Sequence, residues 1–307
     1  MPRFIRHPKE IEGETAIVAG SFDGIHLGHR YLIDRTVQVA DTHGLLSLLI
    51  TFDPHPAHIL LPPEKRPPLL TTRSEKKFLL QSTPLDDVYF HPFDPSFAAM
   101  SGREYLRYLK NRFGMACLIL GYDHKFGSDR LGDVALIRKI GEAYGFRVMQ
   151  AGVYEWEGIK VSSSVIRHLI REGAIRRANR LLGYHYLLSG TVVHGSRFGR
   201  RIGFPTANIQ PENPMKLIPP PGVYYVKTLV ENQWHKAVMN IGNRPTVDGG
   251  RRQIEIHIPG FEGNLYGKHL YSGIIDYLRP EIKFENIENL RRQIASDIEQ
   301  IKQRELE

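Results

Sequence analysis

The hydrophobic period of the sequence changes partway along the chain, and this change limits the folds open to it. In the first half, short apolar runs alternate with segments of helical period. The apolar runs cover 15–21, 45–51 and 116–121, and the helical segments cover 29–43 and 133–144. Capping boxes at Thr72–Glu75 and Ser101–Glu104 mark the starts of two further helices. Strands that alternate with helices predict βαβ units and a mostly parallel sheet.

The second half contains strand-like runs with no helix between them. After Gly190 these runs are TVV, GVYYVKTLV, KAVMNIG, RQIEIHI and LYSGIIDYL. They predict an antiparallel barrel or sandwich. Only the tail is helical, because its apolar residues recur at steps of three and four. These residues form one stripe that we expect to pack on the barrel: Ile287, Leu290, Ile294, Ile298 and Ile301.

Between the halves we predict two short basic helices, at about 163–172 and 174–182, the second ending at Gly183. This places the domain boundary near residue 185, with one domain over 1–184 and the other over 185–307.

The charge of the chain requires an explanation. Lys and Arg number 41 against 33 Asp and Glu, a net charge of +8 with neutral histidines. Arginines gather between Ser164 and Gly203: Arg167, Arg171, Arg176, Arg177, Arg180, Arg197, Arg200 and Arg201. Such a cluster suits nucleic acid, an acidic membrane surface or small phosphorylated ligands, and it is also compatible with a merely solvated basic face.

Cysteine content and hydropathy exclude several classes. A single cysteine, Cys117, cannot form an internal disulfide or a Cys-rich zinc module. The opening residues lack the apolar region of a secretory signal, and no apolar stretch is long enough to span a bilayer. We therefore expect a reducing cytoplasm.

The segment GSFDGIHLGH, at Gly20–His29, stands where the first predicted strand passes into a helix. In open α/β sheets, ligands bind beyond the carboxyl ends of the strands. Glycines at 20, 24 and 28 permit close backbone approach, and a helix N-terminus favours a phosphate. His26 and His29 are spaced so that both rings can face one anion. The competing interpretation is two surface histidines beside a Gly-rich turn; zinc is not expected, because no third ligand lies at suitable spacing.

The segment GSRFGRRIGFPTANI, at 195–209, lacks the spacing of a P-loop. Gly195, Gly199 and Gly203, with Arg200 and Arg201 among them, suggest a nest of backbone amides that accepts phosphate. After Pro205, the side-chain oxygens of Thr206 and Asn208 suit a hard cation such as Mg²⁺. A Gly-rich hairpin between two strands is the competing interpretation.

The first segment resembles the signature of the cytidylyltransferase-like nucleotidyltransferases, whose paired histidines stabilise the α-phosphate as pyrophosphate leaves. TFDPHP (51–56), GYDHKFGSDRLGD (121–133) and VSSSVIR (161–167) resemble the flavin adenylyltransferase branch. The resemblance implies catalytic roles for His26, His29 and Arg167, with Ser163 and Arg167 holding the pyrophosphate. It implies further nucleotide-binding residues, Gly20, Ser21, Phe22, Gly24 and Ser164, and a flavin-binding residue, Asp123. Ser164 replaces the usual threonine and His124 a commoner phenylalanine; the Lys-Met-Ser-Lys-Ser loop of class I aminoacyl-tRNA synthetases is absent from the sequence.

The second segment resembles the riboflavin kinase signature, whose Pro-Thr-Ala-Asn stretch binds ATP and magnesium. NIGNRPT (240–246), IEIHI (254–258) and LRPEIKF (278–284) resemble that family as well. The resemblance implies that Glu255 is the catalytic base, with His257 on the same side of the strand, and that Arg279 lies near the flavin. It implies that ATP is bound by Gly195, Gly199, Arg200, Gly203 and Pro205, and Mg²⁺ by Thr206 and Asn208.

The order of the two resemblances matches the bacterial bifunctional riboflavin kinase/FAD synthetase family. It implies a Rossmann-like nucleotidyltransferase domain with a parallel sheet, followed by a six-stranded antiparallel β-barrel with a C-terminal helix. The barrel would phosphorylate riboflavin to FMN with ATP and Mg²⁺, and the first domain would join FMN to AMP from ATP. We expect small-molecule substrates and neither nucleic acid nor membrane as a partner; no oligomeric state follows. Three alternatives stay open: an enzyme with one of the two activities, a nucleic-acid binder that uses its arginines, and a flavin-dependent oxidoreductase.

Overall fold

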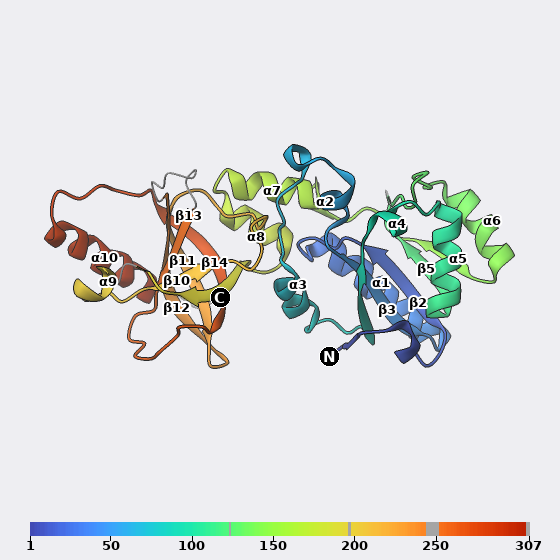
Figure 1. Cartoon of the computed structure of the whole chain (residues 1–307), viewed down its shortest axis with the longest axis horizontal. Coiled ribbons are helices and arrows are strands. Elements are labelled where there is room, and N and C mark those ends of the chain that lie inside the picture. The colour runs from blue at the N-terminus through green and yellow to red at the C-terminus, as the bar shows by residue number, and fades with distance from the viewer. Residues whose placement is uncertain (123, 196–197, 244–251, 305–307) are drawn as a thin grey trace. The chain divides into compact units, whose positions relative to one another are not determined.

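A computed structural model describes residues 1–122, 124–195, 198–243 and 252–304, which divide into two compact units (Figure 1). The α/β unit comprises Met1–Pro68 and Lys76–Ser162, and the barrel unit comprises Leu69–Glu75 and Ser163–Glu307.

The α/β unit is built on a six-stranded sheet in the order β1-β4-β3-β2-β5-β6, in which every neighbouring pair is parallel. This confirms the predicted class. The strands are β1 (Arg3–Ile5), β2 (Thr15–Gly20), β3 (Leu46–Asp53), β4 (Asp87–Pro92), β5 (Met115–Leu120) and β6 (Arg147–Gln150). A separate two-stranded ribbon joins β7 (Glu155–Trp156) to β8 (Ile159–Lys160).

Helices surround this sheet (Figure 1). They are α1 (Leu27–His43), α2 (Pro56–Leu60), α4 (Pro95–Ala98), α5 (Gly102–Phe113), α6 (Val134–Tyr144) and the 3-10 turns η1 (Pro8–Glu10) and η2 (Pro63–Lys65). Helix α3 (Arg73–Leu80) crosses the division between the units. Both capping boxes form as predicted, at Thr72–Glu75 and Ser101–Glu104. Helix α1 begins at Leu27 rather than His29, because the side chain of His26 is its N-cap.

The strand order fixes where a ligand site belongs in this sheet. From β2 the chain proceeds through β3 to β4 on one side, and it then returns to the other side of β2 as β5. The connections therefore leave β2 and β5 in opposite directions, and open α/β sheets bind their ligands at the carboxyl ends of strands that diverge in this way. These ends are Gly20 and Leu120, so the loop after β2 lies where the topology expects a ligand.

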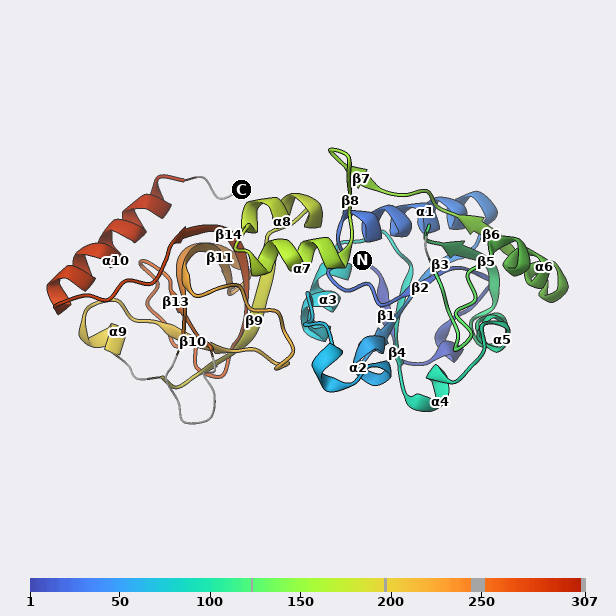
Figure 2. The same cartoon turned by 90° about the horizontal axis from the view of Figure 1, so that it is seen from above.

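The barrel unit is a closed six-stranded antiparallel barrel in the order β10-β13-β12-β11-β14-β9 (Figure 2). This closure decides between the barrel and the sandwich. Its strands are β9 (Tyr186–Val193), β10 (Ala207–Gln210), β11 (Gly222–Val230), β12 (Gln233–Asn243), β13 (Arg252–His257) and β14 (His269–Arg279). The two predicted basic helices are α7 (Ser163–Arg171) and α8 (Ile175–Leu182), and Gly183 ends α8 in the left-handed conformation.

Two expectations for this half were wrong in part. A short helix, α9 (Phe198–Arg201), lies between β9 and β10, although no helix was expected between the strands. It is a single turn and is too short to show a helical period. The tail does form a helix, α10 (Ile287–Lys302), along the outside of the barrel (Figure 2). Its stripe packs only in part: Ile298 and Ile301 join the core with Val223, Tyr225 and Val238, whereas Ile287 is 55% exposed.

A segment from the first half of the sequence belongs to the barrel unit. The backbone N–H of Leu69 donates to the carbonyl of Met215 (2.7 Å), and that of Leu217 donates to the carbonyl of Leu69 (2.8 Å). Lys216 Nζ lies 2.6 Å from Glu75 Oε2, and both side chains are 0% exposed. Glu75 Oε1 also accepts from the backbone N–H of Ser189 in β9 (2.8 Å). Leu69–Glu75 is thus tied to the barrel through backbone pairing and a buried ion pair.

Candidate active sites

The loop between β2 and α1 has an unusual backbone. The φ angles of Phe22 and Ile25 are +45° and +38°, and that of Gly24 is +96°. The left-handed region disfavours residues that carry a side chain, so such a loop persists only where its surroundings hold it. Phe22 and Ile25 are both buried. Space at Gly28 is equally restricted, since a Cβ there would lie 3.3 Å from the His26 ring and from the Val161 carbonyl oxygen.

His26 and His29 lie together at the N-terminus of α1. Their ring centroids are 3.6 Å apart, and their planes differ by 15°. His26 Nδ1 accepts a hydrogen bond of 3.2 Å from the backbone N–H of His29. A neutral imidazole whose Nδ1 accepts carries its proton on Nε2. The cap therefore makes Nε2 of His26 a donor, at a helix end whose dipole favours anions.

The loop after β5 approaches the same place. A Cβ added to Gly20 would come within 4.0 Å of His124 Cε1, so the two loops that follow the diverging strands lie side by side. His124 is one of the two positions that depart from the flavin adenylyltransferase pattern. Asp123, the predicted flavin-binding residue, lies outside the described residues.

Three more predicted residues lie at the start of α7, within the barrel unit. Ser163 is the first residue of the helix, Ser164 follows it, and Arg167 stands one turn later, on the same face as Ser163. Arg167 is largely buried. The roles of Ser163 and Arg167 toward pyrophosphate, and of Ser164 in nucleotide binding, stay predictions.

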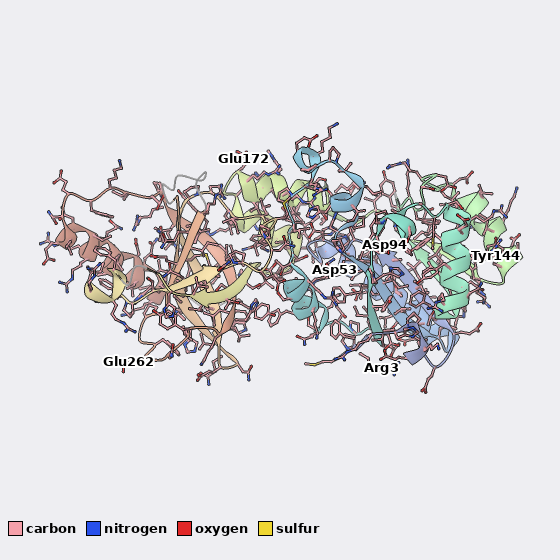
Figure 3. The ribbon with its side chains drawn as sticks, viewed as in Figure 1. Arg3, Asp53, Asp94, Tyr144, Glu172 and Glu262 are labelled. Carbon is pink, nitrogen blue, oxygen red and sulfur yellow. The ribbon has the colours of Figure 1, made fainter. Side chains whose placement is uncertain are left out.

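A lysine that the sequence analysis missed binds the loop after β2. Lys76 Nζ donates to the carbonyl oxygen of Ser21 (2.6 Å) and to Thr51 Oγ1 (3.0 Å). Burial lowers the pKa of Lys76 to about 8, while the charges of Asp23 and Asp53 act in the opposite direction. Asp53, labelled in Figure 3, is the last residue of β3. An ammonium group is thus buried beside the predicted nucleotide loop.

The second predicted loop runs from β9 through α9 to β10. Three backbone N–H groups, those of Ile202, Gly203 and Phe204, donate to carbonyls of Phe198, Arg200 and Gly199. This part of the loop therefore closes a helical turn, and these three amides do not form the expected nest. Gly203 has a φ angle of +88°, as the end of such a turn requires. Arg200 lies in α9 itself.

The glycines of this loop pack against its own polar end. A Cβ at Gly195 would lie 2.2 Å from Asn208 Nδ2, and one at Gly199 would lie 3.3 Å from Thr206 Oγ1. Only glycine permits such contact at Gly195, so the chain closes tightly over Asn208. The predicted ATP-binding glycines and the predicted metal ligands are therefore neighbours.

Asn208 and Glu255 lie directly opposite each other on β10 and β13, and Asn240 of β12 is opposite Glu255 on the other side. Gln253 connects this row: its Nε2 donates to Asn208 Oδ1 (2.9 Å) and to Glu255 Oε1 (2.6 Å). Carboxylate, amide and hydroxyl oxygens are the ligands that Mg²⁺ prefers. The oxygens of Thr206 and Asn208, next to the Glu255 carboxylate, therefore fit a magnesium–phosphate site.

Two other predicted residues have defined partners. Pro205 presents its carbonyl oxygen to His257 Nδ1, which donates at 2.8 Å, and burial lowers the pKa of His257. Arg279 makes a forked ion pair with Asp297 of α10, its Nε and Nη2 lying 3.0 and 2.7 Å from the carboxylate oxygens. Its Nη1 donates to the carbonyl of Pro280. The side chain of Arg279 thus anchors α10, and its contact with flavin stays a prediction.

Sequence spacing could have identified Gln253 as a site residue, but not Lys76. Gln253 stands two residues before Glu255 on a strand, so alternation alone places the two side chains on one face. Lys76 follows a capping box and has no spacing relation to the loop at Ser21; only the fold connects them.

Comparison with known proteins gives matches over both halves. A family model described as riboflavin kinase matches residues 182–304, and one described as FAD synthetase matches residues 8–165. The bifunctional riboflavin kinase/FMN adenylyltransferase of Buchnera aphidicola subsp. Schizaphis graminum is 33% identical over 305 residues, covering 98% of this chain and 97% of the relative. That of Escherichia coli strain K12 is 34% identical over 287 residues, covering 92% and 90%.

A solved structure described as a macrolide-efflux protein from Streptococcus pneumoniae is also similar. It has a TM-score of 0.86 and 28% identity, and the match covers 99% of each chain. Within the described part of the present chain, we find no helix with the length and apolar character needed to cross a membrane.

Proposed function

The chain belongs to the family of bifunctional riboflavin kinase/FMN adenylyltransferases, and from this membership we propose which of its residues carry the two reactions. The chain phosphorylates riboflavin to FMN and transfers AMP from ATP to FMN, giving FAD and pyrophosphate.

For the kinase reaction, Glu255 is the general base. The primary hydroxyl of riboflavin attacks the γ-phosphorus of ATP and loses its proton to the carboxylate, and the bond from the γ-phosphorus to the bridging oxygen breaks to release ADP. Gln253 supports this role, because the hydrogen bond that it donates to Oε1 fixes the position of the carboxylate. The loop residues Gly195, Gly199, Arg200, Gly203 and Pro205 bind ATP.

Magnesium is held by Thr206 and Asn208 beside Glu255. When bound, the ion neutralises negative charge on the phosphate oxygens. Gln253 orients the Asn208 amide, since it donates to Oδ1 and thereby fixes which way the amide points.

For the adenylyl transfer, His26 and His29 bind the α-phosphate. A phosphate oxygen of FMN attacks the α-phosphorus of ATP, and the bond from that phosphorus to the β-bridging oxygen breaks to release pyrophosphate. His26 donates from Nε2 to the charge that develops on the α-phosphate, with the helix dipole acting in the same direction. Gly20, Ser21, Phe22 and Gly24 form the nucleotide loop. Ser163 and Arg167 hold the pyrophosphate, Ser164 contributes to nucleotide binding, and Asp123 binds the flavin.

Further assignments follow from the same premise. The reactions divide between residues 1–184 and 185–307, and the enzyme acts in a reducing cytoplasm on small molecules without nucleic acid.

Burial raises the pKa of the Cys117 thiol, so this one cysteine stays protonated and suits a structural position. Tight binding of DNA or RNA, with an affinity that falls steeply as the salt concentration rises, would contradict the exclusion of nucleic acid.

The observation that carries this assignment is that the two clusters lie in different compact units, the histidines in one and Asn208, Gln253 and Glu255 in the other. One substitution is therefore expected to stop one reaction. With riboflavin, ATP and Mg²⁺, Glu255→Gln lowers FMN formation by about 100-fold or more and leaves FMN-to-FAD conversion intact. His29→Ala lowers FAD formation by a similar factor and lets FMN accumulate.

Chromatographic separation of riboflavin, FMN and FAD measures both variants, and circular dichroism checks their folding. Equal loss of both steps in a folded variant would contradict the division of roles. A wild-type reaction that stops at FMN would indicate a single surviving activity, and flavin retained through desalting would favour the oxidoreductase alternative.

A further inference from the structure

Lys76 has an ammonium group that is buried against the nucleotide loop. The residue is 6% exposed, and its Nζ donates to the Ser21 carbonyl at 2.6 Å and to Thr51 Oγ1 at 3.0 Å. The hydroxyl of Thr51 donates in turn to the same Ser21 carbonyl at 3.0 Å. Ser21 is thus held by one charged and one neutral donor, supplied by α3 and β3.

The loop needs such restraint. Ser21 directly precedes Phe22, the first residue of a run up to Ile25 in which Phe22, Gly24 and Ile25 have positive φ angles and which leads to the His26 cap. A backbone in these sparsely populated conformations persists only when several contacts determine it. Fixing the Ser21 carbonyl orients the peptide that enters this run, and therefore the N–H groups and histidines that follow.

The charge of Lys76 is exposed to opposing influences. Burial disfavours the ammonium form, and Asp23 and Asp53 favour it, with a resulting pKa of about 8. Among the described residues, these two carboxylates are the charged groups that act on the pKa of Lys76. Ammonium groups are rarely buried in proteins unless they are paired or hydrogen-bonded. A bound triphosphate would add negative charge that favours the protonated form of Lys76.

We propose that Lys76 is a positioning residue for adenylyl transfer: through the Ser21 carbonyl it holds the loop Gly20–His26 in the form that receives ATP, and it supplies positive charge beside that loop. This rests on the proposed assignment of the loop as the nucleotide site. The bonds at Ser21 and Thr51 carry the inference.

Lys76→Met is the first test. It is expected to lower kcat for FAD formation from FMN by about 30-fold or more, with a smaller change in the KM for ATP, because a misplaced loop costs transition-state binding. FMN formation in the same sample should stay within about twofold of wild type. Thr51→Val is the matched control, since it removes the neutral donor to the same carbonyl and keeps the charge. Its loss should be several-fold smaller.

The pH profile separates charge from mere structure. The protonated form is the active one, so kcat/KM of the wild type should fall as pH rises through about 8. Thr51→Val should keep this basic limb. Lys76→Arg stays charged across this range, so it should regain part of the activity lost in Lys76→Met and lack the limb near pH 8.

Each result decides. Wild-type kcat in Lys76→Met, or an unchanged basic limb in Lys76→Arg, would overturn the proposal; if Lys76→Met does not fold, the Arg profile alone decides. His29→Ala distinguishes the two levels of the argument. If it retains FAD formation, the assignment of the loop is wrong. If it loses FAD formation while Lys76→Met retains it, only the role of Lys76 is wrong.

Discussion

At the scale of single residues, His26 combines two functions that substitution can separate. Its Nδ1 caps α1, and its Nε2 is the proposed donor to phosphate. His26→Asn keeps an N-cap acceptor and should leave stability within about 0.5 kcal/mol of wild type, whereas His26→Ala should lose about 1 kcal/mol. Both should lower FAD formation by about 100-fold. Urea unfolding and FMN-to-FAD turnover measure the two effects. Full turnover in His26→Asn would leave His26 with a capping role alone.

At the residue level, the sequence pointed to the two motifs but not to the side chains that hold them in place. The two histidines lie in one recognisable motif. Asn208 and Glu255 lie in two such motifs, on strands that pair with each other. Contacts between distant elements were not predicted. Lys76 donates to Ser21 across 55 positions of sequence, and Arg279 pairs with Asp297 of α10. No local period reports such contacts, since they depend on how separate elements pack.

At the scale of elements, α10 offers a direct comparison along one helix. Ile301 is fully buried against the barrel, and Ile287 is 55% exposed. Ile301→Ala should therefore destabilise the barrel by about 2–5 kcal/mol through lost burial and the cavity left behind. Ile287→Ala should change stability by less than about 0.5 kcal/mol. Thermal unfolding of the two variants checks this, and equal effects would restore the uniform stripe that the sequence predicted.

The elements themselves were largely predictable. Strands such as β2 and β3 are continuous apolar runs bounded by turn residues, and α1 ends at Gly44 in the left-handed conformation, as a C-terminal glycine predicts. The single-turn helix α9 and the four-residue strand β10 were missed, because a pattern needs more than one period to be visible. Closure of the barrel depends on pairing between β9 and β10, which a sequence pattern does not report.

At the scale of the whole molecule, the buried pair Glu75–Lys216 joins the barrel to a segment from the first half of the sequence. In the intact chain, Lys216→Met leaves Glu75 as a buried charge without its counterion and should destabilise the barrel by about 3–5 kcal/mol. In an intact chain that already carries Glu75→Gln, the same substitution should cost less than about 1 kcal/mol, because the buried carboxylate charge is already missing. Calorimetry of the four proteins tests this. Equal losses in both backgrounds would show that the ion pair does not govern the effect.

The shared helix α3 also restricts how this enzyme can be taken apart. Glu75 and Lys76 are consecutive, yet the first serves the barrel unit and the second the nucleotide loop. No single cut in the chain gives two fragments that each keep all of their contacts. A kinase fragment on its own would have to carry residues 69–75 as an added peptide. An adenylyltransferase fragment on its own would have to keep residues 69–75 without strand β9, which contacts Glu75.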